Sequence, residues 1–131
     1  SSERALNFYR RLDIPLHRVS TIETAEMSKI VENSYRFLQI TFSEELKMIC
    51  DEKKLDFKDL RNACNTKWNI EIPEARDGIY GHCLPKDVRY LISSFKKTDL
   101  LKAAVLVDSV YRRWVGGRFN QSDRCCARIN Y

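Results

Sequence analysis

The sequence predicts an all-α domain, a helical bundle built on one long central helix. The first observation behind this prediction is a run from Glu23 to Glu52 in which apolar residues recur every three or four positions. The second is that shorter segments on both sides of this run show the same spacing. The third is the length of 131 residues, which suits one domain with a core of its own.

The first twenty residues predict a short helix followed by a connector. Apolar side chains in residues 1–12 follow a helical spacing, after a Ser-Ser-Glu start that can cap a helix. Pro15 then excludes a helix, so residues 13–20 are expected to form a strand or an irregular connection.

The long helix is expected over residues 23–52, where no glycine or proline interrupts the pattern. Thr21 or Thr24 can cap its start, since acidic residues follow both threonines. A helix of this length far exceeds the average of about 11–12 residues in globular proteins. We therefore expect one side of it to pack on its own domain and another side to meet a partner chain.

The second half of the chain predicts further helices joined by a loop. In order, these segments are a short helix over 56–65, a loop over 67–80, a helix over 84–97, a strong helix over 99–114 and an irregular tail over 115–131.

Composition limits the partners. The net charge of +5 permits an anionic ligand, although surplus surface lysine explains it equally well. Aromatic and basic residues do not interleave as they do where bases stack, so we expect no nucleic-acid partner. No apolar run approaches the roughly 20 residues of a membrane span and no signal peptide opens the sequence, so we expect no membrane partner and a cytoplasmic location.

Glycine and cysteine usage exclude two kinds of site. With four glycines, the chain contains neither a dinucleotide-binding fingerprint nor a P-loop. The five cysteines are odd in number and two are adjacent, which indicates reduced thiols rather than a disulfide framework. Because there is no CxxC pair and only two histidines, no metal site is expected.

The stretch "DGIYGHCLPKD" places Cys83 just before a helix that Pro85 is expected to open at its first position, with Leu84 as the cap. The unpaired amides of a helix start favour a thiolate there. Asp87 lies within one turn and can handle protons, so a nucleophile with a carboxylate partner is reasonable. The alternative is a buried structural cysteine with an aspartate that supports the helix start.

Lys29 and Asn33 form a second candidate pair. They are four residues apart in "AEMSKIVENSYR", so they share one face of the long helix beside its apolar stripe. An ammonium and an amide aimed together can hold a developing oxyanion or a water. The alternative is a surface lysine and a neutral asparagine.

Together these segments resemble the UDP-glucose/GDP-mannose dehydrogenase family. "AEMSKIVENSYR" resembles the family motif AEM-x-K-x-x-E-N-[ST]-[YF]-R, "ACNTK" resembles AxNTK, and "GIYGHCLPKD" resembles the catalytic loop G-[VI]-G-G-H-C-[IL]-P-x-D. The resemblance covers residues 1–114, and the histidine before the cysteine is most similar to the UDP-N-acetyl-mannosamine dehydrogenase branch. It implies a dimerising central domain of the 6-phosphogluconate-dehydrogenase-like type over 21–114, preceded over 1–20 by the end of a dinucleotide-binding domain.

The resemblance also implies a chemistry, an NAD-dependent two-step oxidation of a UDP-sugar alcohol to the uronic acid. Cys83 would trap the aldehyde as a thiohemiacetal that becomes a thioester, Asp87 would assist proton transfer, and Lys29 with Asn33 would stabilise the oxyanion and a water. The substrate-binding residues implied are Lys29, Asn33, Gly81 and His82. NAD would be bound by an N-terminal domain and not by this chain.

Two residues depart from the family pattern. Tyr80 stands where the loop normally has glycine, so it is expected to crowd the sugar site or to strain a backbone angle that only glycine takes freely. Asn69 stands near the position of an arginine that reaches the substrate in the family.

Two functions follow as hypotheses. In the first, the chain is the central catalytic and dimerisation domain of a nucleotide-sugar dehydrogenase, inactive alone and active in its intact parent. In the second, it is a non-catalytic helical module that pairs subunits, and its motif cysteine is a relic.

Overall fold

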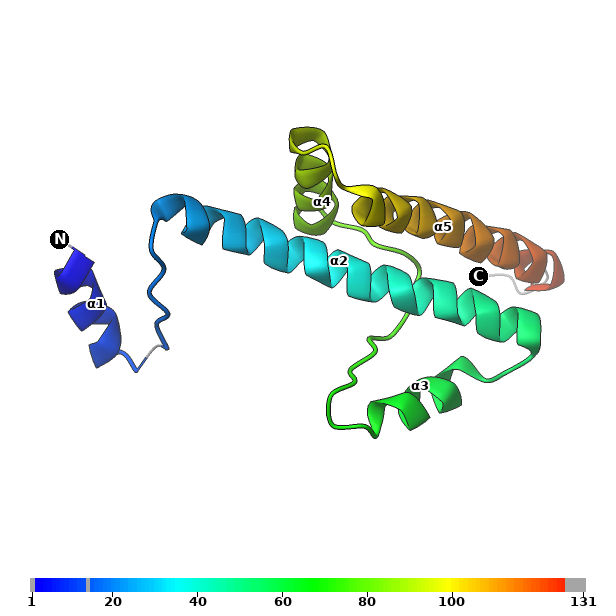
Figure 1. Cartoon of the computed structure of the whole chain (residues 1–131). Coiled ribbons are helices and arrows are strands. Elements are labelled where there is room, and N and C mark those ends of the chain that lie inside the picture. Colours follow the sequence, from blue (N-terminus) through cyan, green and yellow to red (C-terminus); the bar gives the residue numbers. More distant parts are fainter. Residues whose placement is uncertain (1, 14, 127–131) are drawn as a thin grey trace.

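The long helix α2, Ile22–Lys53, is the spine of the fold in this computed structural model, which describes residues 2–13 and 15–126 (Figure 1). The described residues form helices and irregular connections with no strand. Around α2 are arranged α1 (Ser2–Arg11), α3 (Phe57–Asn65), α4 (Cys83–Ser94) and α5 (Asp99–Cys126). The prediction of an all-α fold with one long central helix is confirmed.

Both ends of α2 are capped by short-range backbone and side-chain bonds. The hydroxyl of Thr21 accepts a hydrogen bond of 3.1 Å from the N–H of Thr24, as one of the two predicted caps. At the other end Lys54 takes a left-handed conformation with φ of 59°, and its N–H donates to the carbonyl of Asp51. These caps stop the helix within one residue of each predicted end.

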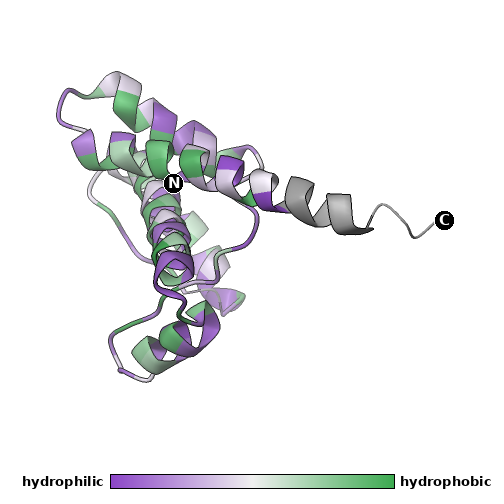
Figure 2. Ribbon diagram, turned by 90° about the vertical axis from the view of Figure 1, so that its right-hand side faces the viewer, coloured by the Kyte–Doolittle hydropathy of each residue, from purple (hydrophilic) through white to green (hydrophobic). Residues whose placement is uncertain are grey.

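The core lies where α4 and α5 pack against the same side of α2, while α3 lies on the opposite side (Figures 1 and 2). Phe37 of α2 and Val88 of α4 are the centre of the apolar cluster, with exposed fractions of 2% and 0%. Ile79 and Ala104 close it from the loop and from α5. The core thus fixes α4, which carries the motif cysteine, against the middle of the spine.

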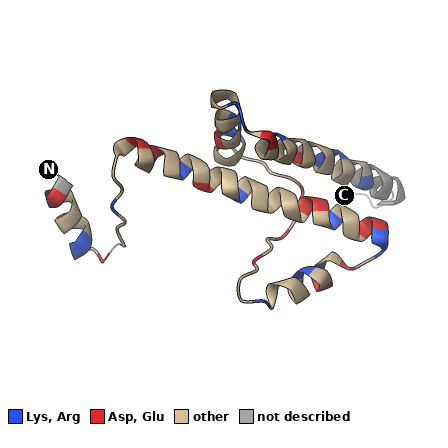
Figure 3. Cartoon of the chain, in the orientation of Figure 1, with Lys and Arg blue, Asp and Glu red and all other residues tan. Residues whose placement is uncertain are grey.

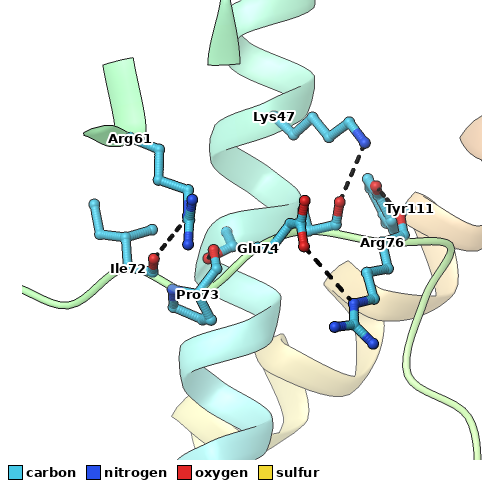
Figure 4. Close-up of polar contacts among 9 residues, drawn as sticks. Lys47, Arg61, Ile72, Pro73, Glu74, Arg76 and Tyr111 are labelled. Carbon is cyan, nitrogen blue, oxygen red and sulfur yellow. Dashed lines mark hydrogen bonds and ion pairs between the residues drawn. The ribbon is translucent and has the colours of Figure 1, made fainter. Parts of the chain in front are cut away.

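The irregular segment between α3 and α4 crosses α2 and is tied down by side chains from three helices (Figure 4). Its carbonyls accept bonds from Ser43 (2.8 Å, to Pro73), Lys47 (3.2 Å, to Ala75), Arg61 (2.9 Å, to Ile72) and Tyr111 (to Arg76). A loop over 67–80 is confirmed, and side chains pair these four carbonyls where no regular structure does so.

Helix α5 is longer than predicted. Residues 115–126 continue the helix instead of forming an irregular tail, and 127–131 lie outside the described residues. Gly116 and Gly117 lie within this helix, although each helical glycine costs about 1 kcal/mol relative to alanine. Arg118, which follows them, pairs with Asp51 of α2 at 2.8 Å, and its guanidinium lies 4.6 Å from the centre of the Trp114 ring.

The connector before α2 is irregular. Residues 13–20 were expected to form either a strand or an irregular connection, and the described residues 13 and 15–20 form no strand.

Basic and acidic residues are interspersed along α2 (Figure 3). Among the described residues, no helix combines the length and the apolar character that crossing a membrane requires.

Candidate functional site

A hollow of about 480 Å³ lies between the first half of α2 and the start of α4. All four residues predicted to be catalytic line it: Lys29 and Asn33 from α2, Cys83 and Asp87 from α4. The two candidate pairs rest on separate sequence patterns and are at least fifty positions apart in the sequence. The packing of α4 on α2 brings them to one place.

A hydrogen bond joins the two pairs directly. The side-chain Nδ2 of Asn33 donates to Oδ2 of Asp87 at 2.7 Å, across 54 positions of sequence. Both residues are partly buried, so this bond is stronger than one in open water. It orients the carboxylate within the hollow and ties α4 to α2 at the level of the thiol.

Cys83 is the first residue of α4, with His82 as the N-cap residue, so the helix begins earlier than predicted. Pro85 is therefore the third helical residue and Asp87 the fifth, not the first and third. Proline is tolerated at this position because the first N–H groups of a helix have no intrahelical partner. The first backbone hydrogen bond of α4 runs from the N–H of Lys86 to the carbonyl of His82. The Cys83 side chain is exposed, so a substrate can reach it.

Gly81 and His82, predicted to bind substrate, do not line this hollow. Gly81 has a φ of +96°, which an L-residue rarely adopts, and it lines a different hollow on the other side of α4. His82 is exposed and makes no side-chain bond to cap α4. Both residues belong to the turn that precedes Cys83, and their part in substrate binding stays a prediction.

Tyr80 does not strain the loop as expected, whereas the expectation that it crowds the sugar site stays a prediction. Its side chain does not line the hollow that contains Cys83; its ring lies 5.5 Å from the guanidinium carbon of Arg112 on α5. Its φ is not positive either, so tyrosine takes this backbone conformation without the strain that was expected. Asn69 lies in the groove between α2 and α3, away from Cys83.

Four further residues line the hollow that were not assigned to the site from the sequence: Glu26, Ile30, Lys86 and Tyr90. Each lies three residues from a predicted site residue on the same helix, so helical spacing could have identified them. Lys86 places a second ammonium group beside Cys83, in addition to Lys29. Among the described residues no group of three or more acidic, histidine or cysteine side chains could hold a metal ion.

A second cluster that the sequence did not reveal lies between α2 and α5. The Glu44 side chain is completely buried, and neither of its carboxylate oxygens has a hydrogen-bond donor. Burial, followed by the nearby Asp108 carboxylate, raises the pKa of Glu44 to about 8. A proton on Glu44 can be donated to Asp108. Burial and the charge of Glu44 also raise the pKa of Tyr111 to about 12.

Comparison with known proteins identifies similar sequences and one similar fold. Residues 23–110 match the model of the UDP-glucose/GDP-mannose dehydrogenase family, central domain. The chain is 32% identical over 109 residues to a UDP-N-acetyl-D-mannosamine dehydrogenase of Yersinia pestis, covering 82% of this chain and 26% of that protein. It is 31% identical over 107 residues to an NDP-N-acetyl-D-galactosaminuronic acid dehydrogenase of Ralstonia solanacearum, covering 81% and 25%.

The structure of a UDP-D-ManNAc dehydrogenase from Pyrococcus horikoshii shares the fold, with a TM-score of 0.69 and 24% identity over 79% of this chain and 25% of that one. The chain therefore spans about a quarter of the length of the relatives it matches. The matched region contains α2, α3, α4 and the first part of α5, and with them all the residues of the thiol hollow.

Proposed function

Because this chain belongs to the UDP-glucose/GDP-mannose dehydrogenase family, we propose that it supplies the catalytic thiol of an NAD-dependent UDP-sugar dehydrogenase that forms a uronic acid. The observation that carries the proposal is the convergence of Cys83, Asp87, Lys29 and Asn33 on one hollow. The name of the relative from Yersinia pestis supports an N-acetylmannosamine-type sugar as the substrate.

In this proposal the exposed Cys83 thiolate adds to the carbonyl carbon of the sugar aldehyde and forms a thiohemiacetal. The carbonyl oxygen gains negative charge in that step, and the ammonium group of Lys29 lines the same hollow. Asp87, oriented by its bond from Asn33, is placed to exchange a proton with the oxygen or with the water that later hydrolyses the thioester. Gly81 and His82 contribute through the turn before Cys83.

The chain does not fit NAD itself. Its four glycines do not form a phosphate-binding loop, and the described residues contain no strand to precede one. When bound, NAD would accept the hydrides of the oxidation, and residues outside this chain would hold it. Cys50, Cys64 and Cys83 are free thiols, which supports a reducing compartment, and we propose the cytoplasm.

A chimera tests the catalytic proposal. Residues 23–110 replace the matching region of the Yersinia pestis relative, and NADH formation is measured with UDP-N-acetylmannosamine. We expect turnover, and we expect Cys83→Ser to lower kcat by at least about a thousandfold because the covalent step is lost. The matched control is Cys64→Ser, a partly buried cysteine of α3 outside the thiol hollow, which should retain activity. The chain alone should not reduce NAD.

A chimera that folds and pairs but is inactive with an intact Cys83 would contradict the catalytic proposal. It would favour the second candidate, a non-catalytic dimerisation module, for which the structure offers a specific observation. Apolar side chains of α2 that face away from α4 and α5 form an outer stripe. Their exposed fractions are 49% for Val31, 61% for Tyr35, 58% for Phe42 and 49% for Ile49.

The outer stripe supports a homodimer in either case. Tyr35, Phe42 and Ile49 are spaced by seven residues, which keeps them in one row along α2. Isolated exposed apolar residues need no explanation, but a continuous row on the longest helix is typical of a contact between chains. We propose that the row pairs with the same row of a second copy.

Phe42→Glu is expected to convert the dimer into a monomer, since it would place two buried carboxylates across a symmetric contact. Light scattering at micromolar concentration measures the mass of both proteins. Leu106→Glu is the matched control, because Leu106 is an apolar residue of α5 with 62% exposure, on a different helix from the stripe. A wild-type monomer, or equal loss of pairing in both variants, would contradict the proposal.

A further inference from the structure

A second hollow, of about 330 Å³, lies on the other side of α4 from the thiol hollow, between α4, α5 and the loop 79–81. The two hollows use different faces of α4: Cys83, Lys86 and Asp87 line the first, whereas Val88 and Arg89 line the second. No residue lines both, so a ligand in the second hollow would not occupy the thiol site.

The polar part of the second hollow is cationic. Arg89 of α4 and Arg112 of α5 approach it from facing helices, and Ser109 adds a hydroxyl. Arg89 is exposed and has no ion pair within the described ranges 2–13 and 15–126. Two guanidinium groups and a hydroxyl around one space are the donors that bind a phosphate group.

Arg112 is held in position from three sides. Its Nε lies 3.1 Å from Oδ2 of Asp108, one turn earlier on α5, and its guanidinium carbon lies 5.5 Å from the centre of the Tyr80 ring. Gly78 makes room for it, since a Cβ on this glycine would lie 2.3 Å from Cγ of Arg112. A pre-positioned guanidinium loses less conformational entropy when it binds an anion.

Asp108 also lines the hollow but does not cancel its positive charge. Oδ1 accepts the N–H of Ile79 at 2.8 Å, Oδ2 faces Arg112, and the side chain is only 5% exposed. This carboxylate is therefore already satisfied within the protein. Arg89 remains as an uncompensated charge at the opening.

The rest of the wall is mainly apolar: Pro85 and Val105 are partly exposed, and the buried side chains of Phe37, Ile79 and Val88 lie behind them. At about 330 Å³ the hollow falls near the lower end of small-molecule sites and is much larger than a phosphate ion requires. We propose that it binds a phosphate monoester, with the phosphate on Arg89, Arg112 and Ser109 and a small apolar body against Pro85 and Val105. This site is independent of the proposed oxidation at Cys83.

Amide chemical shifts of the whole chain test the proposal, with phenyl phosphate and inorganic phosphate titrated at constant ionic strength. Phenyl phosphate should shift the amides of Ser109 and Gly81 in a saturable manner, and it should bind several-fold more tightly than inorganic phosphate. Arg89→Gln should weaken binding by about tenfold or more, because a charge-assisted bond is lost. Arg89 is exposed and unpaired, so this variant should fold normally.

Arg113→Gln is the matched control, since it removes the same charge from an exposed position of α5 that does not line the hollow. Binding should be retained in this variant. Equal weakening in Arg89→Gln and Arg113→Gln would overturn the proposal, because the attraction would then be diffuse. Shifts centred on Lys29 and Asn33 would also overturn it, by placing the ligand in the thiol hollow. Equal affinity for both phosphates would overturn the part played by the apolar wall.

Discussion

Raising the pH from about 5 to about 9 is expected to lower the free energy of unfolding of this domain by an amount on the order of 4 kcal/mol, and Glu44→Gln is expected to remove most of that dependence. The cause is the raised pKa of Glu44, from 4.5 to about 8, which burial produces first and Asp108 second. Between these values the folded chain keeps a proton that the unfolded chain has released. The free energy of unfolding is therefore greatest at low pH and falls as the pH rises.

The surroundings of Glu44 explain why its ionisation is costly. It lies on α2 facing α5, where Asp108 is the nearest acid and Tyr111 adds a second buried group. The charge of Arg112 opposes the rise of the Glu44 pKa, but this guanidinium is already engaged with Asp108. A carboxylate without a donor in such a place is disfavoured by several kcal/mol.

Urea unfolding of the wild type, Glu44→Gln and Glu45→Gln over this pH range measures the effect. Glu45 is the matched control, because it is the adjacent glutamate of α2 but is exposed. The wild type and Glu45→Gln should lose stability together between about pH 5 and about pH 8, whereas Glu44→Gln should keep it. A dependence that is the same in all three proteins would show that Glu44 is not the responsible group.

The contrast between Glu44 and Glu45 also shows what sequence reasoning can reach. The two residues are chemically identical, and only the phase of the helix separates them. Glu44 lies seven residues after Phe37, so both belong to the face of α2 that is buried. The periodicity that predicted α2 could have placed Glu44 on its apolar side, but it contains no sign that α5 supplies a second acid opposite it.

The site was predictable to the extent that helical spacing and proline position determine it. Lys29 and Asn33 share a face because they are four residues apart, and Cys83 lies at a helix start because Pro85 follows closely. The bond from Asn33 to Asp87 was not predictable, since it depends on how α4 crosses α2. The predicted length of α5 was too short for a related reason. The pairing of Arg118 with Asp51 joins two helices that are far apart in the sequence, so no local sequence pattern indicates it.

Asp108→Ala is expected to lower the free energy of unfolding by about 2–4 kcal/mol at pH 5. It leaves the N–H of Ile79 without its acceptor, which is 2.8 Å away in the wild type, and it leaves Arg112 without its carboxylate. Because the Arg112 side chain is 37% exposed, water replaces part of the ion pair, and most of the loss arises at Ile79. Asp99→Ala, at the exposed start of α5, should cost about 0.3–1 kcal/mol and serves as the control.

The same substitution should change the pH dependence, which separates its electrostatic effect from simple loss of packing. Without Asp108 the repulsion acting on Glu44 disappears and Arg112 is free to face it, so the pKa of Glu44 should fall and the destabilisation by Asp108→Ala should shrink as the pH rises. Urea unfolding of both single variants and the double variant with Glu44→Gln measures this coupling. Hydrogen exchange at Ile79 reports the loop directly. Additive effects at every pH would contradict a coupled pair, and an unchanged exchange rate at Ile79 would show that Asp108 does not anchor the turn that presents Cys83.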